Sequence, residues 1–176
     1  MCKSFLFELF HLVTDCIMHF PFAYVRFCYA KIVCKHVGKG TQFSRHVHLI
    51  SPHKISFGDH VFVNRNVTLD GRKCLVIGDN VDIGEYSSVW SLQHNPDNEA
   101  HNTVGGGGTE IKDHCWIAPH SIILPGVIVN RGTVVATASV VTKDTPEMSI
   151  VAGAPARKIK DRYNSCNYIL NYKIIF

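Results

Sequence analysis

Apolar residues recur at every sixth position through much of the second half of the chain. Six successive blocks of six residues begin with Ile or Val: Ile111, Ile117, Ile123, Val129, Val135 and Val141. The fifth place of each block holds a small or compact residue: Cys115, Ser121, Val127, Thr133, Ser139 and Thr145. Helices repeat about every 3.6 residues and strands about every 2.0, so neither element alone gives a strict period of six. A period of six predicts a chain that winds around a triangular prism, with three short strands in each turn.

The same repeat extends back to residue 37. Nine earlier block starts form three trios: Val37, Phe43 and Leu49; Phe57, Val63 and Leu69; Ile77, Ile83 and Val89. Successive trios begin twenty residues apart, whereas the coils that begin at Ile111 and Val129 are eighteen residues apart. We therefore expect two extra residues at one corner of each early coil. Because every start is apolar, the coils should stack about 4.8 Å apart around one core. The pattern predicts a mainly β fold, a parallel β-helix over residues 37–150.

The first 36 residues follow a different pattern. Phe, Leu, Ile and Tyr are abundant from residue 5 to residue 32, and Pro21 divides this segment, which predicts two short helices. Polar residues interrupt the apolar run: Glu8, His11, Asp15, His19 and Arg26. These interruptions argue against a membrane span, and no small-residue cleavage site follows Lys3, so no signal peptide is expected. We expect residues 1–36 to cap the open end of the β-helix. The alternative is an anchor at a membrane surface through residues 1–34.

The composition fits one domain with a C-terminal extension over residues 151–176. Of the 176 residues, 46% are hydrophobic, which is enough for a core. The net charge of +4 is too small to predict nucleic-acid binding. Seven scattered cysteines form no Cys-x-x-Cys pair, which predicts free thiols in a reducing compartment. We therefore expect a cytoplasmic protein, with attachment to the inner face of the membrane as the alternative. Cys115, at an inward position, should pack as a small hydrophobic residue.

One stretch breaks the repeat. Between the starts Ile77 and Ile111 the chain carries sixteen residues more than one eighteen-residue coil needs, and the excess falls at residues 91–109. A loop that leaves a rigid scaffold is a common place for a functional site. His94 lies where this excursion leaves the coil, so it is the candidate general base. His101 lies in the middle of the loop, and the glycines at 105–108 predict a flexible return limb.

Six short segments carry a more specific signal. They are residues 58–66, 91–97, 116–118, 124–127, 141–144 and 151–157, the last reading Val-Ala-Gly-Ala-Pro-Ala-Arg. Through these six segments, residues 36–160 resemble the hexapeptide-repeat O-acetyltransferases. The resemblance is strongest to the sugar and polysaccharide branch, which includes galactoside and maltose acetyltransferases. The N-terminal segment, with His19-Phe20-Pro21 and Arg26, resembles enzymes that acetylate building blocks of cell-surface polysaccharides. The resemblance implies that the β-helix is left-handed.

The resemblance also implies a reaction. His94 matches the general base of the family, which takes a proton from a sugar hydroxyl as that oxygen attacks the thioester of acetyl-CoA. Asn64 matches an Asn that contacts the acceptor, and Asp70 resembles a nearby acceptor-binding Asp, although the local spacing differs. Both could instead form hydrogen bonds at a corner of the prism. Trp116 matches a tryptophan beside the acetyl-CoA and acceptor site. Many relatives have Asp directly after the histidine, where this chain has Asn95. That carboxylate could orient the imidazole, in which case Asn95 would slow the reaction or Asp97 would replace it. It could equally only shape the loop.

The same resemblance implies how the co-substrate binds. Six residues match the family's CoA-binding positions: Ala136, Thr137, Ala138, Thr142, Lys143 and Arg157. Small side chains would let the pantetheine arm lie against the coil, and the two basic residues would pair with the CoA phosphates. The family forms homotrimers with each active site between two subunits. No metal is expected.

Three alternatives remain open at this point. The acceptor of acetyl transfer could be serine or the amine of a nucleotide sugar. The chain could instead be a metal enzyme like the β-helical carbonic anhydrases, with His94, His114 and His120 as zinc ligands. That family spaces its close histidine pair five residues apart, whereas His114 and His120 are six apart. The last alternative is a β-helix scaffold without catalytic activity.

Overall fold

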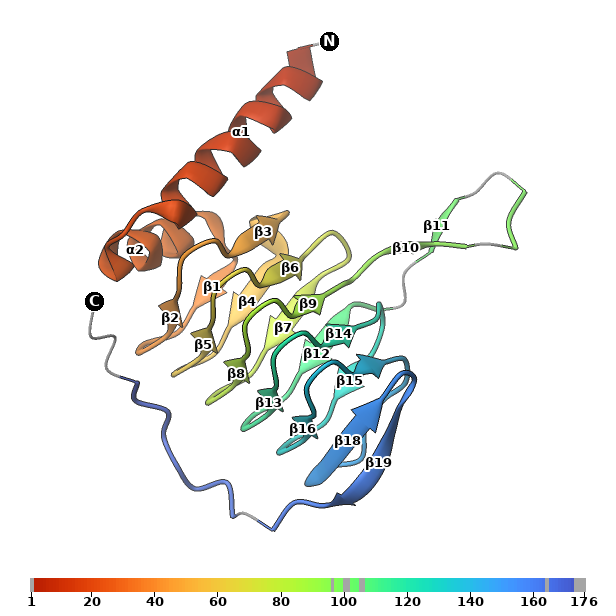
Figure 1. Ribbon diagram of the computed structural model, residues 1–176. Coiled ribbons are helices and arrows are strands. Elements are labelled where there is room, and N and C mark those ends of the chain that lie inside the picture. The colour runs from red at the N-terminus through yellow and green to blue at the C-terminus, as the bar shows by residue number, and fades with distance from the viewer. Residues whose placement is uncertain (1, 96, 100–101, 105–106, 164, 173–176) are drawn as a thin grey trace.

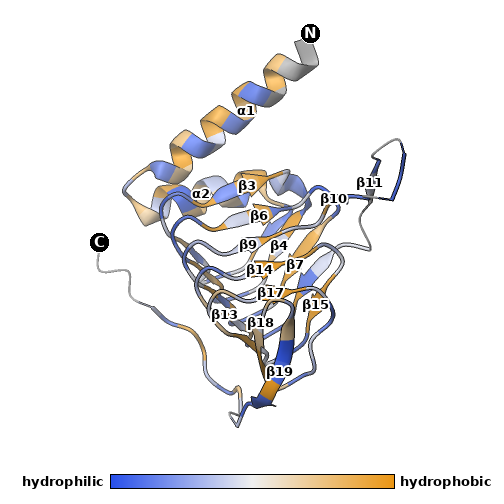
Figure 2. Ribbon diagram, turned by 45° about the vertical axis from the view of Figure 1, so that its right-hand side comes forward, coloured by the Kyte–Doolittle hydropathy of each residue, from blue (hydrophilic) through white to orange (hydrophobic). Residues whose placement is uncertain are grey.

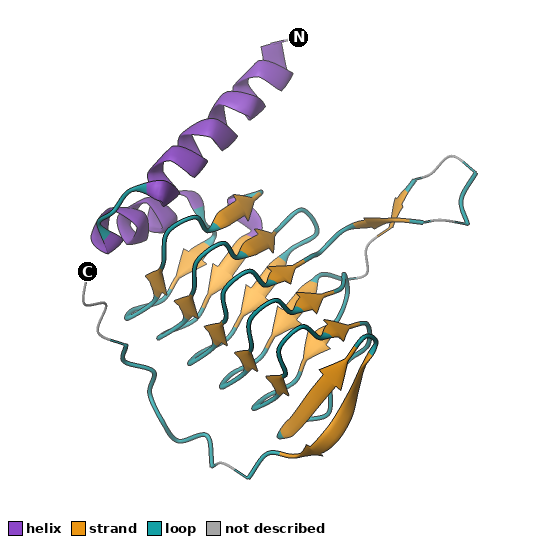
Figure 3. Ribbon diagram, viewed as in Figure 1, coloured by secondary structure: helices purple, strands orange, loops and turns teal. Residues whose placement is uncertain are grey.

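The protein is a parallel β-helix capped by two helices, seen in a computed structural model (Figure 1). The structure describes residues 2–95, 97–99, 102–104, 107–163 and 165–172. Three sheets form the sides of a triangular prism, and the chain passes from sheet A to sheet B, to sheet C and back to sheet A (Figure 3). We name each corner of the prism by the two sheets it joins. The β-helix predicted from the repeat is confirmed.

The strands are short, as expected for hexapeptide coils. Sheet A contains β1 (His36–Val37), β4 (Ile55–Phe57), β7 (Leu75–Ile77), β12 (Thr109–Ile111) and β15 (Ile128–Val129). Sheet B contains β2 (Gln42–Phe43), β5 (Phe62–Val63), β8 (Asp82–Ile83), β13 (Trp116–Ile117), β16 (Val134–Val135), β18 (Ser149–Gly153) and β19 (Ala156–Asp161). Sheet C contains β3 (His48–Ile50), β6 (Thr68–Asp70), β9 (Ser88–Val89), β14 (Ile122–Ile123) and β17 (Val140–Val141).

The block starts of the repeat form the core. All fifteen are buried, from Val37 in the first coil to Val141 in the fifth, and the rings of Phe43 and Phe57 meet edge to face at 5.0 Å. Cys115 is also buried, as expected of an inward position. Because the block start points inward on each side, the parallel strands stack one block start on another between coils, as in the pairs Phe43–Val63 and Val63–Ile83.

The extra residues of the early coils all lie at the C–A corner. In the first coil they form the 3-10 helix η1 (Pro52–Lys54), in the second they form the turn from Gly71 to Cys74, and in the third they form the long excursion. Since every insertion uses the same corner, the strands of successive coils keep their register on all three sides. The excursion itself carries β10 (Gln93–His94) and β11 (Thr103–Val104), an antiparallel pair that projects from the stack (Figure 1).

Two helices precede the first coil, as the sequence predicted. α2 (Ala23–Val33) lies against β1, β2 and η1, while the end of α1 (Cys2–His19) meets β3. Arg26 is 3% exposed, and its Nε donates to the carbonyl of Phe43 at 2.8 Å. Met18 and Ala30 complete the contact with the core. α2 and the end of α1 therefore cover the open edge of the first coil.

The N-terminal part of α1 does not join this cap and projects away from the coils (Figure 1). Bands of apolar and polar residues alternate along it (Figure 2). Large apolar side chains here and around Pro21 are exposed: Phe5, Leu6, Leu9, Phe10, Leu12, Val13, Phe20 and Phe22. Among the phenylalanines of this segment whose side chains are described, Phe27 alone packs against the core. Within the described part of the chain, neither helix has the length and apolarity that crossing a bilayer requires.

The C-terminal residues run back along the outside of the stack. β18 pairs with β16, and β19 folds back on β18 as an antiparallel partner at the last coil. Arg162 Nη1 then donates to the carbonyls of His114 at 2.7 Å and Gly132 at 3.0 Å, along the A–B corner. Leu170 N–H donates to Asn80 Oδ1 at 3.0 Å, one coil nearer the N-terminal end than His114.

Candidate active site

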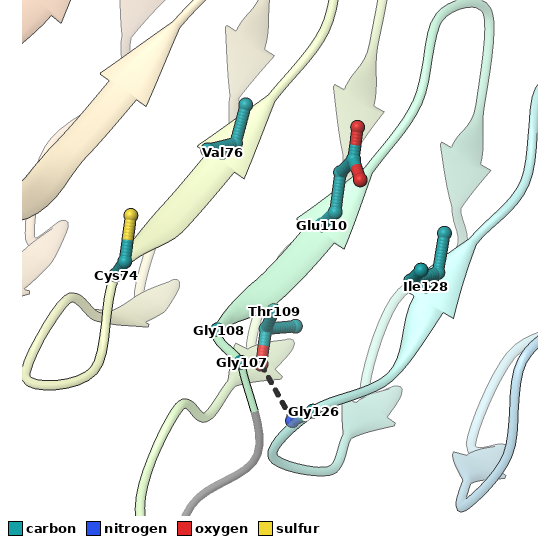
Figure 4. A pocket seen from close by; sticks show the side chains of 8 residues that line it. All are labelled: Cys74, Val76, Gly107, Gly108, Thr109, Glu110, Gly126 and Ile128. Carbon is teal, nitrogen blue, oxygen red and sulfur yellow. Dashed lines mark hydrogen bonds between the residues drawn. The ribbon is translucent and has the colours of Figure 1, made fainter.

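The excursion leaves the β-helix from two fixed points. On the outgoing side, buried Ser91 donates its N–H to Asp70 Oδ2 at 3.1 Å and accepts from the Lys73 N–H at 2.9 Å. On the return side, the Thr109 hydroxyl donates to the Trp90 carbonyl at 2.7 Å and accepts from the Gly126 N–H at 3.1 Å (Figure 4). Both limbs are thus held by buried polar groups that have their hydrogen-bond partners.

His94 stands three residues beyond the outgoing anchor. It lies in β10, opposite Thr103 of β11, and its side chain is exposed. The strand pairing and the Ser91 anchor together hold the backbone of His94, which is what the sequence analysis expected of a residue at the exit from a rigid coil. His101 and the glycines at 105 and 106 lie outside the described residues.

Asn95 shapes the turn of this hairpin. Its Oδ1 accepts from the Asp97 N–H at 3.1 Å, and its own N–H donates to the Asn102 carbonyl at 3.0 Å. An Asn or Asp side chain that accepts from the backbone two residues on is a common turn-forming group. Of the two roles considered for this position, the geometry supports the one in the loop.

Asp70 belongs to the base of the excursion. Its carboxylate is fully buried and accepts from Arg72 Nε at 2.9 Å and Arg72 Nη2 at 3.1 Å, in addition to the Ser91 N–H. Burial acts to raise the pKa of Asp70, but the hydrogen bonds from Arg72 and Ser91 outweigh it and hold the pKa below its ordinary value. Asp70 therefore fixes the limb that carries His94.

Asn64 and Trp116 share the outer face of sheet B. Asn64 follows β5, and its Nδ2 donates to Asp82 Oδ1 at 3.0 Å and to the Ile83 carbonyl at 2.9 Å. Trp116 is 47% exposed and lies beside Asp82 in the register of β13 and β8. Asp82 was missed by the sequence analysis. Its signal is its place in the hexad, immediately before a core residue, which stacks it between Phe62 and Trp116.

The residues matched to CoA binding occupy three places. Ala136, Thr137 and Ala138 form the B–C corner after β16, with Ala138 at φ 57°. Thr142 and Lys143 follow β17 at the C–A corner, and Arg157 lies on β19. Lys143 and Arg157 are exposed. Within one chain, His94 and Lys143 share the C–A corner, whereas Asn64 shares the B–C corner with Ala136. One chain therefore spreads the predicted site residues over the C–A corner, the B–C corner and sheet B, where Trp116 and Arg157 lie.

A shallow depression of about 240 Å³ lies on sheet A beside the return limb (Figure 4). Its lining residues are Cys74, Val76, Gly107, Gly108, Thr109, Glu110, Gly126 and Ile128. None of the residues predicted to bind substrate or co-substrate lines it. We assign the depression to the packing of the return limb against the coil.

The three histidines of the zinc alternative lie on different corners of one chain. His94 leaves from the C–A corner, His114 lies at the A–B corner, and His120 lies at the B–C corner, stacked on Tyr86 at 5.0 Å. In the described ranges, no three His, Cys, Asp or Glu side chains gather in a way that could hold a metal ion.

Known proteins with the same architecture identify the family. No family model matches the sequence. Nodulation protein L of Rhizobium meliloti is 38% identical over 125 residues, which cover 69% of this chain and 67% of that protein. Galactoside O-acetyltransferase of Escherichia coli is 30% identical over 68% of this chain and 61% of its own length. The hexapeptide-repeat acetyltransferase VCA0836 of Vibrio cholerae, solved with acetyl coenzyme A, superposes with a TM-score of 0.83 at 25% identity over 92% of this chain and 90% of that one.

The chain belongs to the hexapeptide-repeat acetyltransferase family. This confirms the resemblance read from the six segments. A further relative, from Schizosaccharomyces pombe, is 34% identical over 108 residues. The matched region covers 52% of that relative's length. The galactoside acetyltransferase structure holds coenzyme A and superposes with a TM-score of 0.79 at 25% identity over 88% of this chain. Acetyl-CoA and CoA are thus ligands of the solved hexapeptide-repeat neighbours.

Proposed function

We propose that this protein transfers an acetyl group from acetyl-CoA to a hydroxyl of a sugar or polysaccharide precursor, with His94 as the general base. The observation that carries the proposal is the placement of His94 on a strand-paired hairpin, three residues from a buried anchor, in a β-helix of the acetyltransferase family. Relatives named for galactoside O-acetylation support the class of acceptor.

In the proposed mechanism His94 takes the proton of the acceptor hydroxyl while the hydroxyl oxygen attacks the thioester carbonyl carbon. The tetrahedral intermediate then breaks its C–S bond, and the imidazolium returns the proton to the CoA thiolate. No acyl-enzyme forms, because both substrates meet in one site and their proximity lowers the barrier. The anchored limb contributes by holding the backbone of His94 in place before the acceptor arrives.

The site is proposed to form between two copies in a homotrimer. In one chain, His94 and Asn64 leave the prism at different corners, so a second copy can bring the base of one chain to the acceptor and CoA residues of its neighbour. Small residues at 136–138 would let the pantetheine arm lie close to the backbone. Lys143 and Arg157, both exposed, would pair with the CoA phosphates.

A cytoplasmic location is part of the proposal. The described cysteines 16, 28, 34, 74, 115 and 166 are free thiols, as a reducing compartment predicts. The exposed apolar side chains of α1 support contact with a membrane surface as the alternative for residues 1–34.

A turnover screen tests the proposed function. Purified protein is incubated with acetyl-CoA and a panel of sugars, nucleotide sugars and serine, and free thiol and product mass are measured. We expect O-acetylated sugar. Acetylation of serine or of a nucleotide-sugar amine alone would replace the acceptor class. The absence of any turnover, with no acetyl-CoA binding by calorimetry, would favour a scaffold without catalytic activity.

A further inference from the structure

A carboxylate lies between aromatic residues on the outer face of sheet B. Asp82 of β8 pairs in register with Phe62 of β5 on one side and Trp116 of β13 on the other. All three occupy the same hexad place, immediately before a buried core residue, so their side chains point outward from successive coils. The face thus offers one charged group between two aromatic rings.

The C-terminal segment adds a third aromatic ring to this face. The ring of Tyr172 lies 4.8 Å from that of Phe62, and its hydroxyl donates to Asp82 Oδ2 at 3.2 Å. Its carbonyl accepts from Gln42 Nε2 at 2.9 Å, which fixes the backbone of the segment on sheet B. The Tyr172 and Asn64 donors hold the two oxygens of Asp82. The carboxylate is therefore oriented, while each oxygen keeps a further lone pair for another donor.

The charged form of the Asp82 side chain is disfavoured in the folded protein. Burial raises the pKa of Asp82 above its ordinary value, although the hydrogen bonds from Tyr172 and Asn64 act to lower it. Within the described residues, no Lys, Arg or His forms an ion pair with this carboxylate. The titratable group that faces it is Tyr172, whose pKa is raised by burial and by the charge of Asp82. A half-buried carboxylate with oriented oxygens and, among the described residues, no cationic partner is typical of a binding site.

We propose that Asp82 is the acceptor-recognition residue, accepting hydrogen bonds from hydroxyl groups of the acceptor, and that Tyr172 and Trp116 form the walls that bind its apolar faces. The inference rests on the proposed acetyl transfer and names residues for its acceptor site. A sugar combines vicinal hydroxyls with apolar C–H faces, which matches a carboxylate between aromatic rings. Asn64, which the family resemblance links to the acceptor, already contacts Asp82.

The first test compares Asp82→Asn with the wild type and with Glu147→Gln, a matched control that removes an exposed carboxylate elsewhere. Asp82→Asn should lower kcat/KM for the acceptor about 10- to 100-fold, mainly through KM, because hydrogen bonds to charged groups are strong. Its acetyl-CoA affinity, measured by calorimetry, should stay within about twofold of wild type, because Asp82 is assigned to the acceptor alone. Tyr172→Phe keeps the ring and should have a smaller effect than Tyr172→Ala.

A second measurement separates recognition from a purely structural role. Because the folded-state pKa of Asp82 is raised, the folded state binds more protons than the unfolded state from about pH 3.8 upward, and stability falls as pH rises through that window. Asp82→Asn should therefore melt at a higher temperature than wild type at pH 7. A lower melting temperature with unchanged acceptor KM would show that Asp82 only fastens the C-terminal segment, and would overturn the inference.

The remaining outcomes distinguish the inference from the function on which it rests. If the wild type acetylates a sugar and Asp82→Asn does so with the same KM, the inference fails alone. If the wild type acetylates no acceptor of the panel, the proposed function fails and the inference fails with it.

Discussion

At the scale of single residues, the loop that carries His94 is held by the side chains of Asp70 and Asn95. Asp70 ties Arg72 and Ser91 together at its base, and Asn95 closes its first turn. The sequence offers a loop-shaping role for position 95 as one of two alternatives, but it does not show which backbone N–H groups the fold brings within reach of either side chain. The place of His94 itself could be predicted, since the break in the repeat marks the exit from the coil.

Basic side chains near the end of the β-helix provide a prediction at this scale. Lys143→Ala and Arg157→Ala should weaken acetyl-CoA more than dephospho-CoA, because charge-assisted pairing with a phosphate contributes about 1.5–3 kcal/mol when well formed. Calorimetric titration of each variant with both ligands measures the difference. Lys39→Ala, which removes an exposed cation at the opposite end of the stack, is the control. Equal losses for both ligands would remove Lys143 and Arg157 from the 3′-phosphate, though not from the pyrophosphate.

At the scale of elements, the coils could be predicted well because the core positions recur every six residues and this period appears directly in the sequence. The N-terminal helices could be located from Pro21 and from their apolar content. The sequence could not predict which helix contacts the coils. α2 packs on the first coil, whereas the start of α1 projects away from it. The path of the C-terminal segment was equally hidden, because Tyr172 and Asp82 are 90 residues apart.

Two truncations test how the helices divide their roles. Deletion of residues 1–34 should leave a folded β-helix of lower solubility, because it uncovers the edge around Val37 and Phe43. Deletion of residues 1–13 keeps α2 and the end of α1, so solubility should be retained. Circular dichroism and sedimentation measure both. Equal solubility of the 1–34 deletion and the full chain would contradict the role of the cap.

The same two truncations test the membrane alternative. Co-sedimentation with anionic liposomes compares the full chain with the 1–13 deletion. Strong binding by the full chain that the 1–13 deletion loses would assign the exposed face of α1 to a membrane surface. Binding by neither chain would leave the helices as a cap only.

At the scale of the whole molecule, the rigid prism carries one long excursion with His94 at the C–A corner and presents Asn64 and residues 136–138 at the B–C corner. This division agrees with the proposed site between two copies, in which His94 is the described histidine with a proposed role. The β-helix supplies the fixed frame, and the hairpin supplies the base.

The turnover of the His94→Ala variant most directly tests the claim that His94 is the general base. Removal of a general base should lower acetyl transfer to the best acceptor by about a hundredfold or more. Acetyl-CoA affinity should change little, and His53→Ala, an exposed histidine at the same corner in the first coil, should behave as wild type. Near-normal turnover by His94→Ala would contradict the account, and His101 would then be the next histidine to replace.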